Sequence, residues 1–436
     1  MAASNGFLRA ANDIRLSRRG LMGLSGAAAA TAMLAGCSSP SGSRTSGGSA
    51  ADELTIMTSG IDAEGLEFMQ KYAGDPLGLK LKLVTVKDET YAAQAASAQQ
   101  AGKSPDIVQW TAEGMSYLMA SGVDLAPLDD YSADLDRSDL YEQDFASGSL
   151  EGKLYALAYG VNCRAIVYRT DYLGSNTTPE EWNSDEFGEW ATSLIGSGRN
   201  AFGWEAKTGD GRGSSNFLPL LWSAGGNTVT GDPGSFKIGF TKSQIETVMN
   251  FYSDMIYKYR VAPSDVGGWG YEDTDGGFSK GTLGAYSVGP FIRSIAAKYP
   301  DTVNNLGVAP LPNLGTPTTF WESSALMIHN QSNKKDKAWA FIEKLRGEEF
   351  QTDVVIGRGG LGVLKSLNTN IKDEFIAPFG RLIETAGLSA PVSAQPFMNN
   401  LFYPAMQEVA LRNTSPADAA QTVMDKADSV LAEVNA

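Results

Sequence analysis

The sequence contains very little histidine and cysteine for its length. Only one of its 436 residues is histidine, His329, and only two are cysteine, Cys37 and Cys163. Zinc sites are built from several Cys or His ligands, so these counts exclude a His-rich or Cys/His metal site. A Ser-His-Asp triad would have to use His329, which ends an apolar segment and is expected to be structural. We therefore expect no catalytic histidine, no metal and no cofactor.

Basic residues are scarce relative to acidic ones. The chain has 35 Lys and Arg against 50 Asp and Glu, which gives a formal net charge of −15 at pH 7. Binding to nucleic acid or to an anionic lipid surface relies on clustered positive charge. The charge balance therefore argues against both partners, and it weakens the case for a strongly anionic ligand.

The sequence also lacks an N-terminal hydrophobic run long enough to span a membrane. Residues 21–36 are apolar or small but number only about 16, whereas a transmembrane helix needs ~20. They follow Arg15, Arg18 and Arg19, so residues 1–36 are predicted to be an export signal. The stretch SRRGLM at residues 17–22 is similar to the twin-arginine export pattern.

The end of this signal predicts a lipid anchor. Residues 34–37, LAGC, resemble the lipobox of bacterial lipoproteins, in which the chain is cut before a cysteine that is then acylated. Residues 37–51 are rich in Ser and Gly and are expected to form a flexible tether. Lipidation of Cys37 would leave Cys163 without a disulfide partner, as a small buried residue. The alternative is an ordinary signal peptide with a chance cysteine.

The rest of the chain is too long for one core and predicts two domains. Strand-like and helix-like segments alternate, which indicates an α/β fold. The strand candidates are residues 54–58, 79–86, 106–109, 165–168, 283–288 and 325–328. The helix candidates are residues 245–259, 338–345 and 416–434, the last with Ser415 as N-cap and Pro416 at its first position.

Six stretches, in order, carry a family resemblance. They are LTIMTSGIDAEGL (54–66), GKSPDIVQWTAE (102–113), GKLYALAYGVNCRAIVYRTDYL (152–173), TTPEEWNSDEF (177–187), FSKGTLGAYSVGPF (278–291) and GVAPLPNLGTPTTFWESSALMI (307–328). Together they resemble family 1 extracellular solute-binding proteins, the maltose-binding-protein-like, carbohydrate-binding lipoproteins of ABC importers. The resemblance covers residues 52–436. The chain departs from the family pattern at Arg169 and Thr170, and at Phe291, where the family has Trp.

The resemblance implies a fold and a division of the chain. Family members have the type II periplasmic-binding-protein fold, in which two α/β lobes close about a hinge on a ligand in the cleft between them. We expect the first lobe to comprise residues 52–160 and 327–370. The second lobe is expected to comprise residues 161–326 and 371–436.

The resemblance also implies ligand contacts from both lobes, with aromatic faces against sugar rings and polar groups on hydroxyls. The matching positions are Ser59, Gly60, Asp62, Trp110, Glu113, Asn162, Arg164, Asn216, Phe217, Trp269, Phe291, Trp321, Glu322, Arg358, Asn399, Asn400 and Tyr403. Asn162 replaces an acidic residue of the family, and Asn399 and Asn400 replace aromatic ones. The aromatic residues could instead pack in the core, and Asp62 and Glu113 could be helix N-terminal charges.

These observations predict a monomeric, lipid-anchored binding protein that captures a carbohydrate and delivers it to an ABC permease, without chemistry. Its expected location is the outer face of the bacterial cytoplasmic membrane. One alternative is a membrane-tethered glycoside hydrolase, which would need only a pair of carboxyl groups. Another is a binding protein for a non-sugar solute on the same fold. The substitutions at Asn162, Asn399 and Asn400 argue against a maltodextrin as the ligand.

Overall fold

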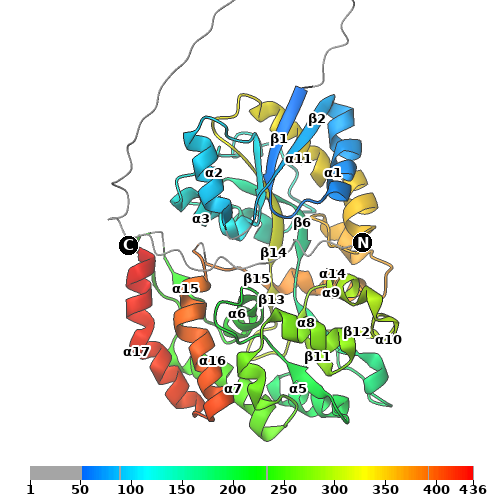
Figure 1. Cartoon of the computed structure of the whole chain (residues 1–436), viewed down its shortest axis with the longest axis vertical. Coiled ribbons are helices and arrows are strands. Elements are labelled where there is room, and N and C mark those ends of the chain that lie inside the picture. The colour runs from blue at the N-terminus through cyan, green and yellow to red at the C-terminus, as the bar shows by residue number, and fades with distance from the viewer. Residues whose placement is uncertain (1–51, 88–89, 232–233, 391, 436) are drawn as a thin grey trace, which may run out of the picture.

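The computed structural model of the chain describes residues 52–87, 90–231, 234–390 and 392–435. The predicted export signal, the tether and Cys37 lie outside the described residues. The described chain forms two α/β lobes, each with its own sheet (Figure 1). The predicted two-lobe α/β fold is confirmed. None of the described helices is both long and apolar enough to cross a bilayer.

The first lobe is built on a five-stranded sheet with the order β2-β1-β3-β14-β6. Its strands are β1 (Asp52–Thr58), β2 (Leu79–Thr85), β3 (Ile107–Trp110), β6 (Ala156–Asn162) and β14 (Glu322–Ile328). β1 pairs in parallel with β2 and β3, whereas β14 runs antiparallel to β3 and β6. The helices of this lobe include α1 (Ala63–Met69), α2 (Tyr91–Gln100), α3 (Met115–Ala120), α4 (Glu142–Ser147) and α11 (Lys335–Arg346).

The second lobe is built on a four-stranded sheet with the order β12-β7-β11-β8. Its strands are β7 (Ala165–Arg169), β8 (Asn200–Gly203), β11 (Leu283–Val288) and β12 (Leu306–Ala309). The parallel strands β8 and β11 point their carboxyl ends the same way. The helices of this lobe include α5 (Ser184–Ala191), α6 (Gly213–Ser223), α7 (Lys242–Ser253), α8 (Tyr271–Lys280), α16 (Tyr403–Arg412) and α17 (Pro416–Asn435).

Two chain segments cross between the lobes side by side. β6 ends at Asn162 and β7 begins at Ala165, so only two residues separate a strand of the first sheet from one of the second. The other crossing runs from β13 (Thr319–Phe320) into β14. The Arg164 backbone N–H donates to the Thr319 hydroxyl at 3.0 Å, which ties the two crossings together. Figure 1 shows β6 and β14 extending from the upper lobe toward the lower one.

The chain passes from the first sheet to the second close to the predicted lobe boundaries. Residues 160–161 lie inside β6 and residues 326–327 lie inside β14, and both strands belong wholly to the first sheet. The ladder that pairs Glu322 with Asn162 extends the first sheet beyond both expected boundaries. The hydrophobic pattern does not change where the chain passes from one lobe to the other, because the residues on either side of the boundary are similarly buried.

The predicted elements occur where the sequence pattern placed them. α7 continues as a π-helical turn, Asp254–Lys258, and together they cover residues 245–258 of the helix predicted for residues 245–259. α17 begins at Pro416, and the Ser415 hydroxyl accepts from the Asp418 N–H at 3.1 Å, as expected for an N-cap. Cys163 is fully buried, as predicted, with its thiol 3.5 Å from the Phe379 carbonyl oxygen.

Candidate ligand-binding site

A line of polar side chains follows the two crossings from one lobe to the other. Glu322 is the ladder partner of Asn162 and lies 3.2 Å from the guanidinium of Arg164, measured from Oε2 to Nη1. Arg164 has no exposed surface, and its Nε donates to the Ser215 hydroxyl at 3.0 Å. Ser215 precedes Asn216 in the first turns of α6. These polar contacts run beside an apolar cluster that spans the crossings and includes Val161, Cys163 and Trp321.

Several buried polar atoms of the junction have no hydrogen-bonding partner among the described residues. They are Glu113 Oε1, Asn162 Oδ1, Arg164 Nη2, Arg212 Nε, Asn216 Oδ1 and Trp321 Nε1. A buried donor or acceptor left without a partner costs ~1–3 kcal/mol, and such groups are rare in native proteins. Other buried polar atoms of the described chain also lack partners, for example Tyr252 Oη and Arg346 Nη2, so the six junction atoms are candidate contacts for a polar molecule.

Glu113 marks the first-lobe end of this line. It lies in the turn Ala112–Gly114 that follows β3, and Thr111 caps the turn. The neighbouring Ala112 N–H donates to the Ser323 hydroxyl at 3.2 Å, which ties this turn to β14. Burial raises the pKa of the Glu113 carboxyl to about 8, and the nearby charge of Glu322 adds to the effect. Glu113 is therefore mostly protonated at neutral pH and can donate a hydrogen bond.

A second buried carboxyl lies at the second-lobe end of the line. Glu205, just after β8, accepts hydrogen bonds from the Asn216 side-chain amide and from the Thr274 hydroxyl. Burial is the largest cause that raises the pKa of Glu205 to about 7, and the positive charge of Arg212 opposes it. The amide of Asn216 is thus held by Glu205, with its Oδ1 left without a partner among the described residues.

Two arginines flank the ring of Phe291. The guanidinium carbons of Arg164 and Arg212 lie 5.4 and 5.3 Å from its ring centroid. Each arginine also has a carboxylate partner, Glu322 for Arg164 and, at 2.6 Å, Asp275 for Arg212. Phe291 is half-buried and lies close to both cations, an arrangement that favours an aromatic ring. The structure thus places the predicted Phe291, Arg164 and Glu322 together.

Three aromatic side chains, those of Tyr91, Trp110 and Tyr117, lie together at the carboxyl end of β3 and are called the aromatic row. Trp110 stacks on Tyr91, with ring centroids 5.0 Å apart and an interplanar angle of 11°. Tyr117 of α3 lies 6.4 Å from Trp110 at a tilt of 51° and is 47% exposed. Gly114 makes room for the indole, because a Cβ there would lie 2.6 Å from it. Sequence reasoning identified Trp110 but missed Tyr91 and Tyr117, which no pattern placed beside it.

The first loop lies on the same lobe. The Gly60 and Ile61 N–H groups donate to the Thr58 hydroxyl, and Asp62 caps α1 by accepting from the Gly65 N–H at 2.7 Å. Ser59 and Gly60 are half-buried at the end of β1. Arg358 is exposed and pairs with Glu64 of α1 at 2.9 Å. Asp62 is thus the N-cap of α1, and Arg358 lies beside the same helix.

Several predicted site residues lie in the protein core. Phe217 is fully buried and stacks on Phe402, with ring centroids 4.4 Å apart. Trp321 is 1% exposed and packs against Tyr141. The ring of Tyr403 is fully buried, and its hydroxyl donates to the Asp210 carbonyl. The structure does not present these three rings to a ligand.

The remaining predicted residues lie on other parts of the second lobe. The Asn399 side chain accepts from the Gly209 N–H at 2.9 Å and so holds the loop that leads to Arg212. Asn400 is exposed. Trp269 lines a cavity of about 500 Å³ with Arg199 and Asn200, at the start of β8. The cavity lies at the starts of β8 and β11, although the Trp269 ring also packs against Gly203 at the end of β8.

His329 follows β14 and is 1% exposed. Burial lowers its pKa, and its Nδ1 accepts from the Gln331 N–H at 3.2 Å. No group of three or more His, Cys, Asp or Glu side chains in the described part of the chain is arranged to hold a metal ion.

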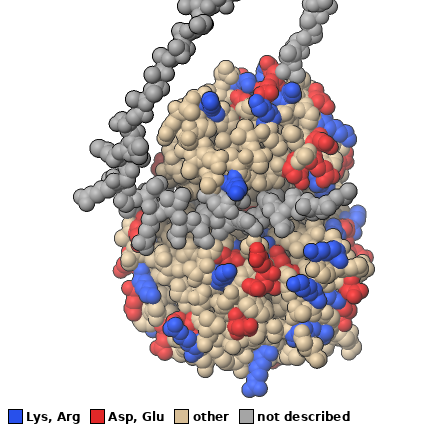
Figure 2. Space-filling model, in the orientation of Figure 1, with Lys and Arg blue, Asp and Glu red and all other residues tan. Residues whose placement is uncertain are grey.

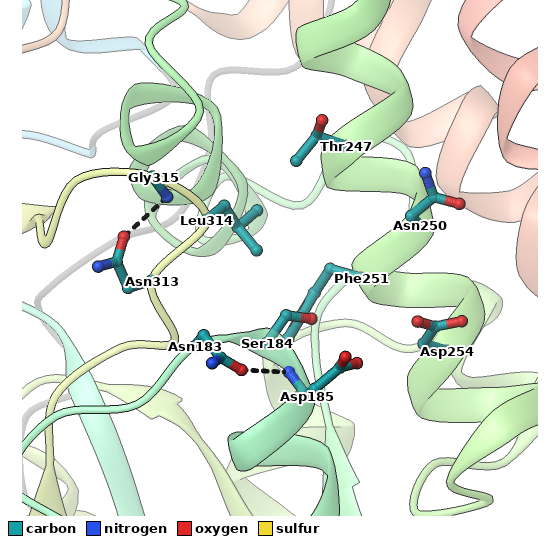
Figure 3. A pocket seen from close by; sticks show the side chains of 10 residues that line it. All are labelled: Asn183, Ser184, Asp185, Thr247, Asn250, Phe251, Asp254, Asn313, Leu314 and Gly315. Carbon is teal, nitrogen blue, oxygen red and sulfur yellow. Dashed lines mark hydrogen bonds between the residues drawn. The ribbon is translucent and has the colours of Figure 1, made fainter.

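A larger pocket of about 550 Å³ lies on the second lobe (Figure 3). It is lined by Asn183, Ser184, Asp185, Thr247, Asn250, Phe251, Asp254, Asn313, Leu314 and Gly315. Figure 3 shows side chains of α7 facing the start of α5 and the loop of residues 313–315. None of the predicted site residues lines it.

On the face seen in Figure 2, Lys and Arg are interspersed with Asp and Glu over both lobes.

Comparison with known proteins agrees with this architecture. Residues 67–377 match the model of the bacterial extracellular solute-binding protein family, so the chain belongs to that family. The family consists of extracellular binding proteins, and the chain is accordingly a binding protein rather than an enzyme.

Solved structures share the fold at low sequence identity. One is the cyclic α-maltosyl-1,6-maltose binding protein from Arthrobacter globiformis, with a TM-score of 0.74 and 19% identity, covering 87% of this chain and 98% of that one. Another is the GacH receptor of Streptomyces glaucescens GLA.O, solved unliganded and with acarbose, with a TM-score of 0.70, 19% identity and coverage of 88% and 99%. A third is UgpB from Mycobacterium tuberculosis in complex with glycerophosphocholine, with a TM-score of 0.66, 20% identity and coverage of 87% and 98%.

Proposed function

We propose that the protein captures a carbohydrate at the junction of its two lobes and delivers it to an ABC permease. Ligand capture in this fold is closure of two lobes about a hinge. The β6–β7 link and the β13–β14 link are the hinge in this proposal. The lobes are then residues 52–162 with 322–370, and residues 165–320 with 371–436.

The observation that carries the proposal is the line of unpartnered buried polar atoms across the junction. Glu113, Asn162 and Asn216 each leave one oxygen without a partner among the described residues, while Arg164 leaves one terminal nitrogen. Hydroxyl groups donate and accept at the same atom. A sugar could therefore satisfy both kinds of group, whereas a molecule with only donors or only acceptors could not.

The aromatic residues support the same class of ligand. Trp110 is partly exposed beside Tyr117, at the end of the first-lobe strand that leads to Glu113. Phe291 presents a half-buried ring from the second lobe. The C–H faces of a sugar ring pack on such surfaces while its hydroxyls bind at the ring edge. The proposed contacts are Trp110, Tyr117, Glu113, Asn162, Asn216 and Phe291, with Arg164 and Glu322 orienting them.

Anchoring and delivery rest on the sequence and on the family. The lipobox-like LAGC at residues 34–37 supports attachment through Cys37 to the outer face of the cytoplasmic membrane. Residues 37–51 would let the binding domain reach a permease while it remains tethered. We propose a monomer, because a single chain supplies both halves of the site.

Calorimetric titration of the mature protein tests the proposal. Protein starting at residue 38 would be unfolded and refolded to remove bound ligand, and then titrated with mono- to tetrasaccharides. We expect saturable binding of one saccharide class and recovery of the saccharide unchanged. The Trp110→Ala variant should bind more weakly. Trp339→Ala, which removes a tryptophan tilted against Tyr131 in the same lobe, should retain wild-type affinity. The proposal fails if no saccharide binds, or if both variants lose affinity equally.

A second candidate ligand class is a phosphodiester or another anionic small molecule. The N–H groups of Arg164 and Arg212 that have no described partners, close to Phe291, favour it. Guanidinium groups bind phosphate oxygens well. Each arginine, however, is already neutralised by one carboxylate. Glycerophosphocholine in the same titration separates the two candidates, because only an anionic ligand should lose affinity steeply as salt is raised.

A further inference from the structure

The cavity that Trp269 lines has the chemistry of a small sugar-binding site. Its wall consists of Gly198, Arg199, Asn200, Trp269, Asp273, Gly277, Thr282 and Leu283, and its volume is about 500 Å³. Cavities of ~300–1,000 Å³ are the usual size for small-molecule sites. This wall combines an indole with a guanidinium, an amide, a carboxylate and a hydroxyl.

Several polar side chains of this wall have hydrogen-bonding groups that are not used within the described protein. The Asn200 side chain has no hydrogen-bonding partner among the described residues, although its backbone pairs with Thr282. Arg199 uses Nε to bind the Leu194 carbonyl at 3.0 Å and stacks on Tyr172, which leaves its two terminal amino groups available. Asp273 uses one carboxylate oxygen to accept from the Gly270 N–H at 2.9 Å. Its other oxygen has no partner in the described chain.

The indole of Trp269 is held in place from behind. It packs against Gly203 and Leu283, and a Cβ on Gly203 would lie 2.7 Å from the ring. The Trp269 carbonyl accepts from the N–H groups of Ala206 and Lys207, both at 2.9 Å. The ring is nevertheless only partly buried, so one part of it faces the cavity.

The cavity is separate from the lobe junction. Asn200 and Leu283 are paired at the starts of β8 and β11, whereas Glu205 and Phe291 follow the ends of these strands. The six residues of β11 span roughly 16 Å at ~3.3 Å per residue. α8 also divides the two regions, because Thr274 and Asp275 bind groups at the junction while Asp273 and Gly277 line the cavity.

We propose that this cavity is a second binding site, which takes a neutral pyranose ring. The indole would cover the C–H face of the ring, and Arg199, Asn200, Asp273 and Thr282 would bind its hydroxyls. One cation and one carboxylate on the wall balance each other, which favours a neutral ligand over an anion or a cation. This proposal does not depend on the function proposed for the junction, because no residue is shared between the two sites.

Fluorine NMR of protein labelled with 5-fluorotryptophan tests this site directly. The sequence has eight tryptophans, and the signal missing from Trp269→Phe identifies that of Trp269. The probes are D-glucose, D-galactose, D-mannose and maltotetraose, with sorbitol as an open-chain control for viscosity and hydroxyl content. We expect a saturable shift of the Trp269 signal by at least one probe, with a Kd on the order of 1 to 100 mM.

Variants separate the second site from the junction. The Asn200→Ala variant, which loses no described hydrogen bond, should weaken the binding reported by Trp269 about tenfold or more, equal to ~1.4 kcal/mol. Trp110→Ala should leave it unchanged. The proposal is overturned if no cyclic probe shifts the signal beyond what sorbitol does, if Asn200→Ala has no effect, or if Trp110→Ala abolishes the shift. If the probes shift the Trp269 signal but not the Trp110 signal, the result contradicts only the site proposed at the lobe junction.

Discussion

The carboxyl of Glu113 should make the ligand-free protein less stable as the pH rises. Burial raises its pKa from the ordinary value of 4.5 to about 8. Below pH 4.5 the group is protonated in both the folded and the unfolded chain, and it has no effect on the pH dependence of stability. Above that pH the unfolded chain releases the proton and the folded chain keeps it. The free energy of unfolding therefore falls until the folded group also ionises, near pH 8.

The size of this effect follows from the two pKa values. Stability falls by ~1.4 kcal/mol for each pH unit between them, so the full decrease from pH 4.5 to 8 is about 5 kcal/mol. This is comparable with the whole stability of many domains, ~5–15 kcal/mol. Replacement of Glu113 by glutamine removes the ionisation and nearly preserves the shape of the side chain. The Glu113→Gln variant should thus become more stable than the wild type at alkaline pH.

Urea unfolding of both proteins at intervals from pH 4.5 to 8.5 measures the difference. Buried Glu205 titrates in both proteins, so its contribution cancels when one curve is subtracted from the other. A matched control is Glu67→Gln, which changes an exposed carboxyl on α1. Its difference curve shows what the loss of a surface carboxyl contributes without burial. A flat difference curve for Glu113→Gln would refute the reasoning, because it would mean that Glu113 ionises alike in both states.

Three further predictions concern the junction and the core. Trp110→Ala should lower saccharide affinity at least tenfold, measured by calorimetry, because it removes the ring stacked on Tyr91. Arg164→Met should cost ~3–5 kcal/mol of unfolding free energy, since it leaves the Glu322 carboxylate buried without its cation; the added change Glu322→Leu should recover much of this loss. Phe217→Ala should destabilise the protein by ~3–5 kcal/mol in urea unfolding and leave saccharide affinity unchanged, because the ring lies in the core.

Each of these predictions has its own contradicting result. Wild-type affinity in Trp110→Ala would remove the aromatic row from the proposed site. Equal stability of Arg164→Met and the wild type would show that the buried Glu322 carboxylate does not need this cation. A loss of saccharide affinity in Phe217→Ala without a loss of stability would indicate that Phe217 contacts the ligand.

Much of the fold could be predicted from the sequence because it depends on local periodicity. The apolar faces of residues 245–259 and 416–434 identified their helices, and Ser415 with Pro416 marked where the last helix begins. The alternation of strand-like and helix-like segments gave the α/β class. The lobe boundaries were harder to place, because β6 and β14 continue the first sheet with no change in burial.

The proposed site could be predicted less well, because it depends on contacts between distant segments. Trp110 and Phe291 were found through motifs, but nothing local distinguishes them from Phe217 or Trp269. Phe217 meets Phe402, 185 positions away, and becomes a core residue. Tyr117 escaped notice because its place beside Trp110 depends on the turn at Gly114.

The sequence by itself predicted the α/β class, the strands and helices with a clear apolar periodicity, and the acidic charge, since these follow from residue type and spacing along one chain. Only the tertiary structure decided which polar groups were left without partners at the junction, and which aromatic rings kept an exposed surface. The physical reason is that burial and desolvation depend on everything that packs around a group. Glu113 is an ordinary glutamate in the sequence, and its raised pKa comes first from burial, to which the charge of Glu322, 209 positions away, adds.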